Sequence, residues 1–407
     1  MKRIIQYVLL ILCFVIELNM ITVMADSAYD SEDTLELYGE SALLLDAKSG
    51  NILYEKKGNE VKAIASTTKV LTCLIALENG NLDDIVTVSE NAASQPDVQM
   101  HIVSGEQYRL GDLLVGMMLE SYNDVSVAVA EHISGSTEAF AQRMNERAKS
   151  IGCKNSCFIT PNGLDAEING QENGSTAYDI ALIMAEAINN PEFLEITQTR
   201  QYTIHELENK RTVNVYNRNA FLDSYEGVIS GKTGFTGKAG YCYVCAVKRD
   251  DRTFIAVTLG SGWPPHKTYK WTDMRTLFDY GFANYKYRTL DFNPEENKKL
   301  IPINNAKGNN YKETVYAQYK VSLDQTKRLL NKNDSYYAKL VLPKNLQAPL
   351  EKGEIIGTLE IYVNNTVVEK REIRMAHDVV EMDFFTKIYQ ILRYFFAKIC
   401  RKPIEIT

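Results

Sequence analysis

The order of strand-like and helix-like patterns along the first part of this chain limits its fold more than any other sequence feature. Residues 42–46 and 52–56 have the composition of strands joined by a turn, and residues 240–248 and 253–260 predict a second such pair. Apolar residues recur at helical spacing between the two pairs and just after the second, over residues 66–78, 110–119, 124–133, 138–150, 176–188 and 270–285. Strands that flank a run of helices indicate an α+β domain, in which helices cover an antiparallel sheet.

A second domain with a different pattern follows. Short alternating segments, typical of strands, occupy residues 314–321, 336–341, 355–363 and 366–373. Asn364 and Asn365 are placed to form a hairpin turn. We therefore predict a first domain over residues 35–287 and a small all-β domain over residues 291–375. The second domain shows no cluster of reactive side chains, so support or spacing is its expected role.

The N-terminus predicts a cleaved export signal over residues 1–25. Lys2 and Arg3 precede an apolar run at residues 7–16, and small residues end at Ala25. Glu17 interrupts the apolar character directly after the run, which disfavours a membrane-spanning helix. The protein is therefore expected to be exported from the cytoplasm.

The last segment, residues 376–402, predicts a helix with one apolar face. Its large apolar side chains recur at helical spacing, at Phe384, Phe385, Ile388, Ile391, Leu392, Phe395, Phe396 and Ile399. Basic residues occupy other positions, and no acid lies between Phe384 and Lys402. Such a helix favours an anionic membrane surface, so we expect it to hold the protein on the outer face of the cytoplasmic membrane. The alternative is a helix whose apolar face packs on its own domain.

Charge, histidines and cysteines disfavour several kinds of function. The formal net charge of −7 argues against nucleic acid as a partner. The five histidines have no metal-ligand spacing, so a zinc hydrolase is disfavoured and no metal or cofactor is expected. Cys242 and Cys245 lie in a predicted strand, where their side chains point to opposite faces. We therefore expect buried free thiols rather than a redox or metal-binding pair.

Ser66 and Lys69 are the strongest local indication of chemistry. Residues three apart share a face of a helix. A serine hydroxyl is a poor nucleophile until a base removes its proton, and a neutral lysine amine one turn away can be that base. The pair is a weak signal by itself, because a helix N-cap followed by a solvated lysine gives the same letters.

Two further elements strengthen this signal. Ser121 and Asn123 lie between two predicted helices, and Lys232 and Thr233 open a probable strand just before Gly234. Each element alone is common in turns and strand ends. In this order, however, Ser-x-x-Lys, Ser-x-Asn and Lys-Thr-Gly form the set found in penicillin-binding proteins and class A β-lactamases.

The chain resembles the low-molecular-weight penicillin-binding proteins of the serine-type D-alanyl-D-alanine carboxypeptidase family. The likeness covers about residues 35–285 and extends more loosely over the β domain and the tail. Four stretches carry it, at residues 65–69, 120–135, 158–179 and 231–242. Tyr122 departs from the pattern, since a small residue is more usual there, and its bulk is expected to affect substrate access.

The resemblance implies catalytic roles for the matching residues. Ser66 attacks the carbonyl of the penultimate D-alanine to form an acyl-enzyme, which water then releases, and Lys69 is the base. Free lysine has a pKa near ~10.4, so burial and the nearby charge of Lys232 must lower it. Ser121 relays a proton to the leaving amine, and Asn123 holds Lys69 or the substrate amide.

The resemblance also implies binding roles along the predicted strand. Lys232 and Thr233 bind the terminal carboxylate, and Gly234 leaves room for the substrate backbone. The backbone N–H of Phe235 forms an oxyanion hole together with that of the nucleophile. Lys270 stands where an arginine often helps to bind the carboxylate. The implied partners are peptidoglycan stem peptides ending in D-alanyl-D-alanine, with β-lactam antibiotics as covalent inhibitors.

Three other functions stay open at this point. A β-lactamase shares these motifs but needs an acid that primes water for rapid deacylation, and Asp165 and Glu167, near Asn162, are possible candidates. A transpeptidase passes the acyl group to an amine instead of water. A catalytically idle peptidoglycan-binding protein belongs to a different class, and the intact nucleophile–base pair argues against it.

Overall fold

The computed structural model of the full chain describes residues 35–290, 292, 299–308, 313–321 and 326–399. The predicted export signal therefore lies outside the described residues. The chain divides into two compact units, the first ending at Gly281 and the second beginning at Phe282. The domain limits predicted at residues 287 and 291 fall a few residues beyond this division.

A five-stranded antiparallel sheet forms the centre of the first unit. Its strands lie in the order β2 (Ile52–Lys56), β1 (Ser41–Asp46), β11 (Arg252–Leu259), β10 (Gly240–Arg249) and β9 (Val228–Thr236). The two predicted strand pairs thus join through β1 and β11, with Leu44 opposite Ala256. Both faces of β1 are buried, because Leu43 faces the main core while Leu44 lies close to Gly281 on the other side. This explains why β1 is continuously apolar rather than alternating.

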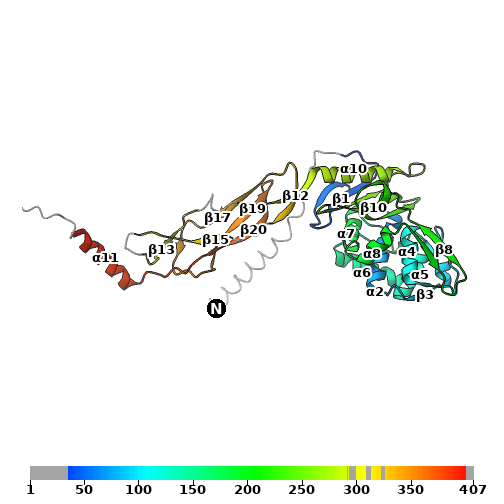
Figure 1. Cartoon of the computed structure of the whole chain (residues 1–407), viewed down its shortest axis with the longest axis horizontal. Coiled ribbons are helices and arrows are strands. Elements are labelled where there is room, and N and C mark those ends of the chain that lie inside the picture. Colours follow the sequence, from blue (N-terminus) through cyan, green and yellow to red (C-terminus); the bar gives the residue numbers. More distant parts are fainter. Residues whose placement is uncertain (1–34, 291, 293–298, 309–312, 322–325, 400–407) are drawn as a thin grey trace, which may run out of the picture. The chain divides into compact units, whose positions relative to one another are not determined.

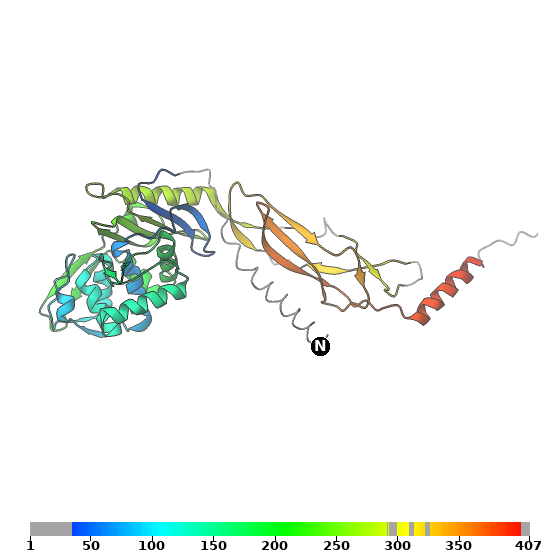
Figure 2. The ribbon, with the colours of Figure 1, turned by 180° about the vertical axis from the view of Figure 1, so that it is seen from behind.

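Helices cover both faces of this sheet, as Figures 1 and 2 show. One face carries α10 (Tyr269–Asn284). The other face carries α2 (Lys69–Asn79), α4 (Leu110–Leu119), α5 (Asn123–Ser134), α6 (Thr137–Ile151), α7 (Ala177–Ala187) and α8 (Pro191–Gln198). The main hydrophobic core lies between these helices and the sheet. The predicted α+β fold, an antiparallel sheet covered by helices, is confirmed.

Shorter elements connect the helices of the first unit. They are η1 (Ala65–Thr68), β3 (Ile85–Thr87), α3 (Glu90–Ala93), β4 (Gln107–Arg109), β5 (Glu167–Ile168), β6 (Gln171–Glu172), β7 (Gln201–His205), β8 (Thr212–Tyr216) and α9 (Phe221–Ser224). β3 pairs with β4, β5 with β6 and β7 with β8, each as a separate two-stranded ribbon.

Capping residues set the helix limits. The Ser136 hydroxyl accepts the Ala139 N–H at the start of α6, and the Thr176 hydroxyl accepts the Asp179 N–H at the start of α7. Gly152 ends α6 with a left-handed φ of 107°, a conformation that glycine adopts without steric cost. Local sequence therefore accounts for the limits of these helices.

Two limits differ from those predicted. The helix expected from Ser66 begins instead as the 3₁₀ turn η1, and α2 follows from Lys69. The strand expected to open at Lys232 begins four residues earlier, at Val228, which puts Lys232 in the middle of β9. β9 reaches back because its first half pairs with β10, down to Val228 opposite Val247.

The second unit is built from β-ribbons and small sheets. Its strands are β12 (Tyr285–Thr289), β13 (Pro302–Asn304), β14 (Val315–Tyr316), β15 (Tyr319–Val321), β16 (Lys327–Asn331), β17 (Tyr336–Val341), β18 (Leu346–Gln347), β19 (Ile355–Val363) and β20 (Thr366–Met375). The strand predicted at residues 314–321 is two, since β14 pairs with β13 whereas β15 pairs with β20. Asn364 and Asn365 form the predicted hairpin turn, both with positive φ.

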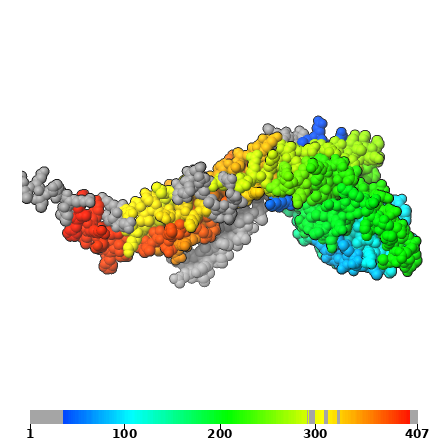
Figure 3. Space-filling view, in the orientation of Figure 1, coloured from blue at the N-terminus to red at the C-terminus, as the bar shows by residue number. Residues whose placement is uncertain are grey.

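The chain ends, among the described residues, in the helix α11 (Phe384–Ile399). Its side chains are red in the space-filling view of Figure 3. Its large apolar residues from Phe384 to Phe396 are exposed, for example Ile391 to 38% and Phe385 to 81%. Within the described residues, no helix combines the length and the apolar character needed to cross a membrane.

Candidate active site

Ser66 and Lys69 lie where the turn η1 passes into α2. Residues three apart nearly eclipse one another in a 3₁₀ turn, and the Lys69 Nζ lies 2.9 Å from the Ser66 Oγ. Ala65 enters the turn with a left-handed φ of 46°, an uncommon conformation for a residue other than glycine. The predicted nucleophile and base are thus in hydrogen-bond contact.

Neutral oxygen atoms surround the amine of Lys69. The amine donates to Asn123 Oδ1 at 2.9 Å and to the backbone carbonyl of Asn162 at 2.8 Å. No part of Lys69 is exposed. Burial lowers the pKa of Lys69 well below its usual range, the charge of Lys232 lowers it further, and Asp124 opposes the shift. A lowered pKa favours the neutral amine, which is the form that can accept a proton.

Lys232 brings a second buried amine from β9, which is an edge strand of the sheet. Its Nζ donates to the Ser121 Oγ at 3.0 Å and to the carbonyl of Thr233 at 2.9 Å. Burial lowers the pKa of Lys232 to about 7. Ser121 adopts a left-handed φ of 70° just before α5 begins at Asn123. The Ser-x-Asn motif therefore contacts both lysines, Ser121 on Lys232 and Asn123 on Lys69.

Gly234 has a different neighbour from the one predicted. A Cβ atom at this position would lie 2.8 Å from the backbone N of Ser66 and 3.0 Å from that of Thr67. The missing side chain therefore makes room for the nucleophile turn, while the predicted role towards the substrate backbone stays a prediction. The Ser66 N–H therefore lies beside β9 at Gly234, the residue before Phe235.

Thr233 and Phe235 project from the opposite face of β9 to Lys232 and Gly234, since side chains alternate along a strand. Phe235 is 44% exposed, and its ring centre lies 4.7 Å from that of Tyr241. Tyr241 is the residue of β10 that pairs with Phe235.

Lys270, at the start of α10, reaches the same face of the sheet. Its Nζ lies 4.6 Å from the ring centre of Tyr241 and 4.7 Å from that of Trp271, and it donates to the carbonyl of Lys267. Burial, and to a smaller extent the charge of Lys267, lowers the pKa of Lys270 to about 8. Through Tyr241, Lys270 is brought to the face that carries Thr233 and Phe235, and it makes no hydrogen bond with Lys69.

Sequence reasoning missed the backbone of Asn162 as part of the site. Its carbonyl accepts the Lys69 amine and lies 3.5 Å from the Ser66 Oγ. Gly163 follows with a φ of 81°, and a Cβ atom there would lie 2.0 Å from the carbonyl oxygen of Ala65. The loop can therefore approach the nucleophile turn only with glycine at this position. The sequence of residues 161–163 indicates a turn, but it does not show that this turn contacts Ser66 and Lys69.

The acids considered for a β-lactamase make no hydrogen bond to the nucleophile among the described residues. Asp165 accepts a hydrogen bond from the Thr236 hydroxyl at 3.2 Å. Glu167 is exposed on the short ribbon of β5 and β6. The Asn162 side chain is also engaged, since its amide donates to Gln95 and its oxygen accepts the Leu164 N–H. Within the described residues, no carboxylate makes a hydrogen bond to Ser66 or Lys69.

Tyr122 is directed into the protein. Its ring lies beside Gly116 of α4, where an added Cβ atom would meet it at 3.5 Å, and it packs against the main core. Because Gly116 leaves space for the ring, the expected effect of Tyr122 on substrate access has no support in the structure.

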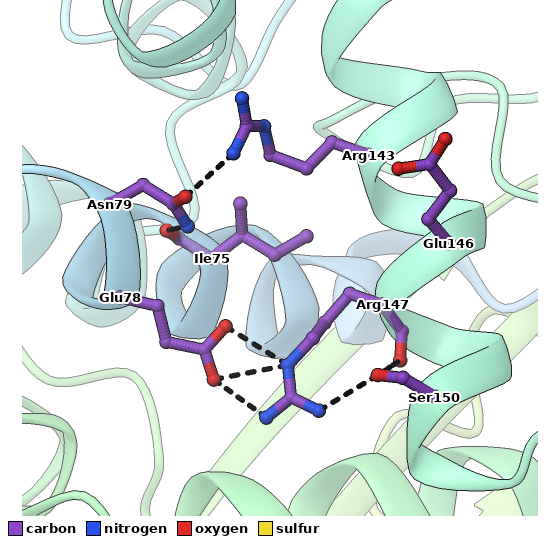
Figure 4. Close-up of a pocket in the computed structure, with 7 residues that line it drawn as sticks. All are labelled: Ile75, Glu78, Asn79, Arg143, Glu146, Arg147 and Ser150. Carbon is purple, nitrogen blue, oxygen red and sulfur yellow. Dashed lines mark hydrogen bonds and ion pairs between the residues drawn. The ribbon is translucent and has the colours of Figure 1, made fainter.

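A separate hollow between α2 and α6 is bordered by contacts between these two helices (Figure 4). Arg147 contacts Glu78 at 2.6 Å, and Arg143 donates to Asn79 at 2.6 Å. Glu78 and Asn79 lie at the end of α2 opposite to Lys69, about 14 Å away along an axis that rises 1.5 Å per residue. We therefore interpret this hollow as a helix contact and not as part of the site.

Comparison with known protein families agrees with this geometry. The family described as D-alanyl-D-alanine carboxypeptidase matches residues 27–262, and the penicillin-binding protein 5 C-terminal domain matches residues 297–381. The D-alanyl-D-alanine carboxypeptidase DacF of Bacillus subtilis is 32% identical over 377 residues, which cover 90% of this chain and 94% of the relative. The carboxypeptidase DacC of Escherichia coli is 29% identical, with 90% and 92% covered.

Solved structures give the same result. The D-alanyl-D-alanine carboxypeptidase DacD of Francisella tularensis superposes with a TM-score of 0.66 and 25% identity, over 88% of this chain and 98% of that one. Penicillin-binding protein 5 of Haemophilus influenzae gives a TM-score of 0.63 and 29% identity, over 86% and 99%. The family match spans more than half of the length of this chain. This chain therefore belongs to the D-alanyl-D-alanine carboxypeptidase family.

Proposed function

We propose that this protein is a penicillin-sensitive serine D-alanyl-D-alanine carboxypeptidase that removes the terminal D-alanine from peptidoglycan stem peptides during cell-wall maturation. The observation that carries the proposal is the Lys69 amine, fully buried, lowered in pKa and 2.9 Å from the Ser66 hydroxyl. A peptidoglycan-binding protein without catalysis has no use for a neutral base beside a serine.

The proposed chemistry combines these contacts with the roles that the family resemblance implies. The neutral Lys69 amine takes the Ser66 proton as Oγ attacks the carbonyl of the penultimate D-alanine. The developing oxyanion is held by the N–H groups of Ser66 and Phe235, each donor contributing roughly 2.7–4 kcal/mol. Collapse breaks the peptide bond, and the proton reaches the leaving amine of the terminal D-alanine through Ser121. Water then hydrolyses the ester on Ser66 and releases the shortened peptide.

Three cationic or hydroxyl groups are suited to bind the terminal carboxylate. Lys232 lies in the site beside Ser121, Thr233 follows it on β9, and Lys270 reaches the face of the sheet that carries Thr233. The pKa of the Lys232 amine lies at about 7, so an incoming carboxylate favours its charged form. The side-chain oxygen of Asn123 accepts a hydrogen bond from Lys69 and is therefore suited to hold the base rather than the carboxylate.

Product analysis tests this function. The purified protein is expected to release free D-alanine from a diacetylated tripeptide ending in D-alanyl-D-alanine, and to stay acylated by benzylpenicillin for many minutes. Rapid turnover of the penicillin indicates a β-lactamase, and transfer to an added glycine in place of hydrolysis indicates a transpeptidase. If the protein neither releases D-alanine nor is acylated, the proposal is contradicted and the catalytically idle binding protein is favoured.

The pH dependence of kcat/KM should carry a limb from Lys232. Above its pKa of about 7 the amine loses the charge that binds the carboxylate, so kcat/KM should fall as the pH rises from 7 to 9. In kcat/KM such a limb reports the free enzyme. In a Lys232→Arg variant the side chain stays protonated over this pH range. Its kcat/KM should therefore not fall between pH 7 and 9, even if its overall value is lower than that of the wild type. A wild-type profile that stays flat to pH 9 contradicts this role for Lys232.

We further propose that α11 holds the enzyme on the outer face of the cytoplasmic membrane. The exposure of its apolar side chains supports a free apolar face. A polar residue of the helix, Gln390, ties it to its own unit by donating to the carbonyl of Gly308 at 2.9 Å. A helix held by its polar side, with phenylalanines exposed and basic residues between, is suited to an anionic bilayer.

Loss of the helix should release active enzyme. The cut should follow Asp383, because Val379 and Met382 donate backbone hydrogen bonds to Leu350 and Asn305 and belong to the second unit. Protein that lacks residues 1–25 and 384–407 is expected to keep its activity and to stop sedimenting with vesicles that contain phosphatidylglycerol.

A full-length version of this test replaces Phe385 and Phe396 with serine. Vesicle binding should weaken more than tenfold, since burying one such side chain contributes about 1.5–3 kcal/mol. Tyr337→Ser, on an exposed residue of β17, is the matched control and should bind like the wild type. Unchanged binding by the double variant excludes α11 as the anchor.

A further inference from the structure

Asp124, the residue after the catalytic Asn123, is a buried carboxylate that the reaction scheme does not use. None of it is exposed. Its two oxygens accept long-range hydrogen bonds from backbone N–H groups, Oδ1 from Met100 at 3.0 Å and Oδ2 from Ile102 at 3.2 Å. In the described part of the chain it forms no ion pair. A buried charge is costly unless hydrogen bonds compensate it. Asp124 therefore holds these backbone N–H groups firmly, and the question is what that restraint does for the site.

The segment that Asp124 holds is the one that orients Asn123. The Asn123 Nδ2 donates to the carbonyls of Pro96 and Asp97, at 3.1 and 2.9 Å, and its backbone N donates to Val98 at 2.7 Å. Because the Nδ2 group is fixed on these two carbonyls, the Oδ1 atom is the one turned to Lys69. We call residues 96–102 the wall segment.

The wall segment is also held from its outer side. Arg211, just before β8, donates to the carbonyls of Met100 and His101. Asp124 thus fixes the N–H groups of this short stretch from within, and Arg211 fixes its carbonyls from without. These two charged groups restrain the backbone of residues 100–102. The carbonyls of Pro96 and Asp97, which orient Asn123, belong to the same wall segment.

The charge of Asp124 also reaches the base. Around the Lys69 amine lie the hydroxyl of Ser66, the side-chain oxygen of Asn123 and the carbonyl of Asn162, all uncharged. The charged groups that act on it are Lys232, which favours the neutral amine, and Asp124, which favours the protonated one. Asp124 therefore limits how far the site can neutralise its base.

We propose that Asp124 is a positioning residue for acylation, which holds the wall segment so that Asn123 keeps its oxygen on the amine of Lys69. This inference rests on the proposed function, since it concerns the base of that reaction. It assigns a role to a residue outside the Ser-x-x-Lys, Ser-x-Asn and Lys-Thr-Gly motifs, and it explains why a carboxylate is buried beside the site.

The test is Asp124→Asn in the full mature chain, measured by the rate of acylation with a fluorescent penicillin between pH 5 and 9. The amide turns an N–H donor towards Met100 or Ile102, which displaces the wall segment. A misplacement of about 1 Å can cost roughly 10²-fold, and a loss of that order in the acylation rate is expected. The acid limb should also move to lower pH, because the group that raised the pKa of Lys69 is gone.

Glu131→Gln is the matched control. It removes one carboxylate from the same helix, α5, at a residue that also accepts side-chain hydrogen bonds, from Ser89 and Asn91. It should acylate with the wild-type rate and acid limb. An equal loss of rate in this control, or an Asp124→Asn variant that acylates with the wild-type rate, overturns the proposal. A wild-type protein that is not acylated instead contradicts the proposed function.

A second variant keeps the test decisive if Asp124→Asn does not fold. Arg211→Gln loosens the wall segment from its outer side, at a residue that is not fully buried. It should slow acylation several-fold and leave the acid limb in place, because it leaves Asp124 untouched. A wild-type acylation rate in this variant shows that the wall segment does not position Asn123, and overturns the proposal.

Discussion

Replacing Ser66 with alanine is expected to lower D-alanine release by at least about 10⁴-fold, since loss of the nucleophile removes the covalent pathway altogether. Penicillin labelling should disappear in the same variant. The fold should persist, because the Ser66 hydroxyl makes few contacts and the Lys69 amine keeps Asn123 and the Asn162 carbonyl as partners. Stopped-flow acylation and a D-alanine assay measure both effects.

The control for this prediction is Ser94→Ala, at an exposed serine whose hydroxyl bonds only locally, to Asn91. It should keep full activity and labelling. If Ser66→Ala still labels with penicillin, another residue is the nucleophile and the assignment of the Ser-x-x-Lys motif fails.

Replacing Lys69 with arginine is expected to lower acylation by about 10²–10⁴-fold, the usual contribution of a general base. Arginine keeps the positive charge but cannot lose its proton at any accessible pH, so it tests the neutral amine directly. Lys69→Met, which has no base at all, should be equally slow. Activity of Lys69→Arg near that of the wild type contradicts the role of Lys69 as base.

The Lys69→Met variant should also separate activity from stability. The pKa of Lys69 is lowered in the folded protein, so the unfolded chain binds a proton that the folded one does not. That difference destabilises the wild type below the usual lysine pKa and fades as the pH rises towards it. Lys69→Met should therefore unfold at a higher temperature than the wild type at pH 7, with a smaller gain at pH 9. A lower unfolding temperature for Lys69→Met contradicts the view that the amine is buried at a cost.

Much of the fold was predictable because its signals are local. The apolar run of β1, the helical spacing of α4 to α7 and the Asn364–Asn365 hairpin are each visible in a short window. The early start of β9 was not visible, since it depends on pairing with β10. The split of residues 314–321 into β14 and β15 likewise depends on two different partner strands.

The site was predictable only for groups that side-chain motifs name. Ser66, Lys69 and Asn123 were expected to meet, and they do. The carbonyl of Asn162 was missed because motifs identify side chains, whereas every residue carries the same backbone oxygen. Gly234 was assigned to the substrate, but its close neighbour is the nucleophile turn, which no linear pattern reveals.

Mass spectrometry of the penicillin adduct tests the central claim most directly, because it identifies the acylated residue and the class of enzyme together. After brief exposure to benzylpenicillin and proteolysis, the peptide that contains Ser66 should carry one intact penicilloyl group, placed on Ser66 by fragmentation. An adduct on Ser121 or on any other residue, or no adduct while D-alanine is still released, contradicts the acyl-enzyme on Ser66.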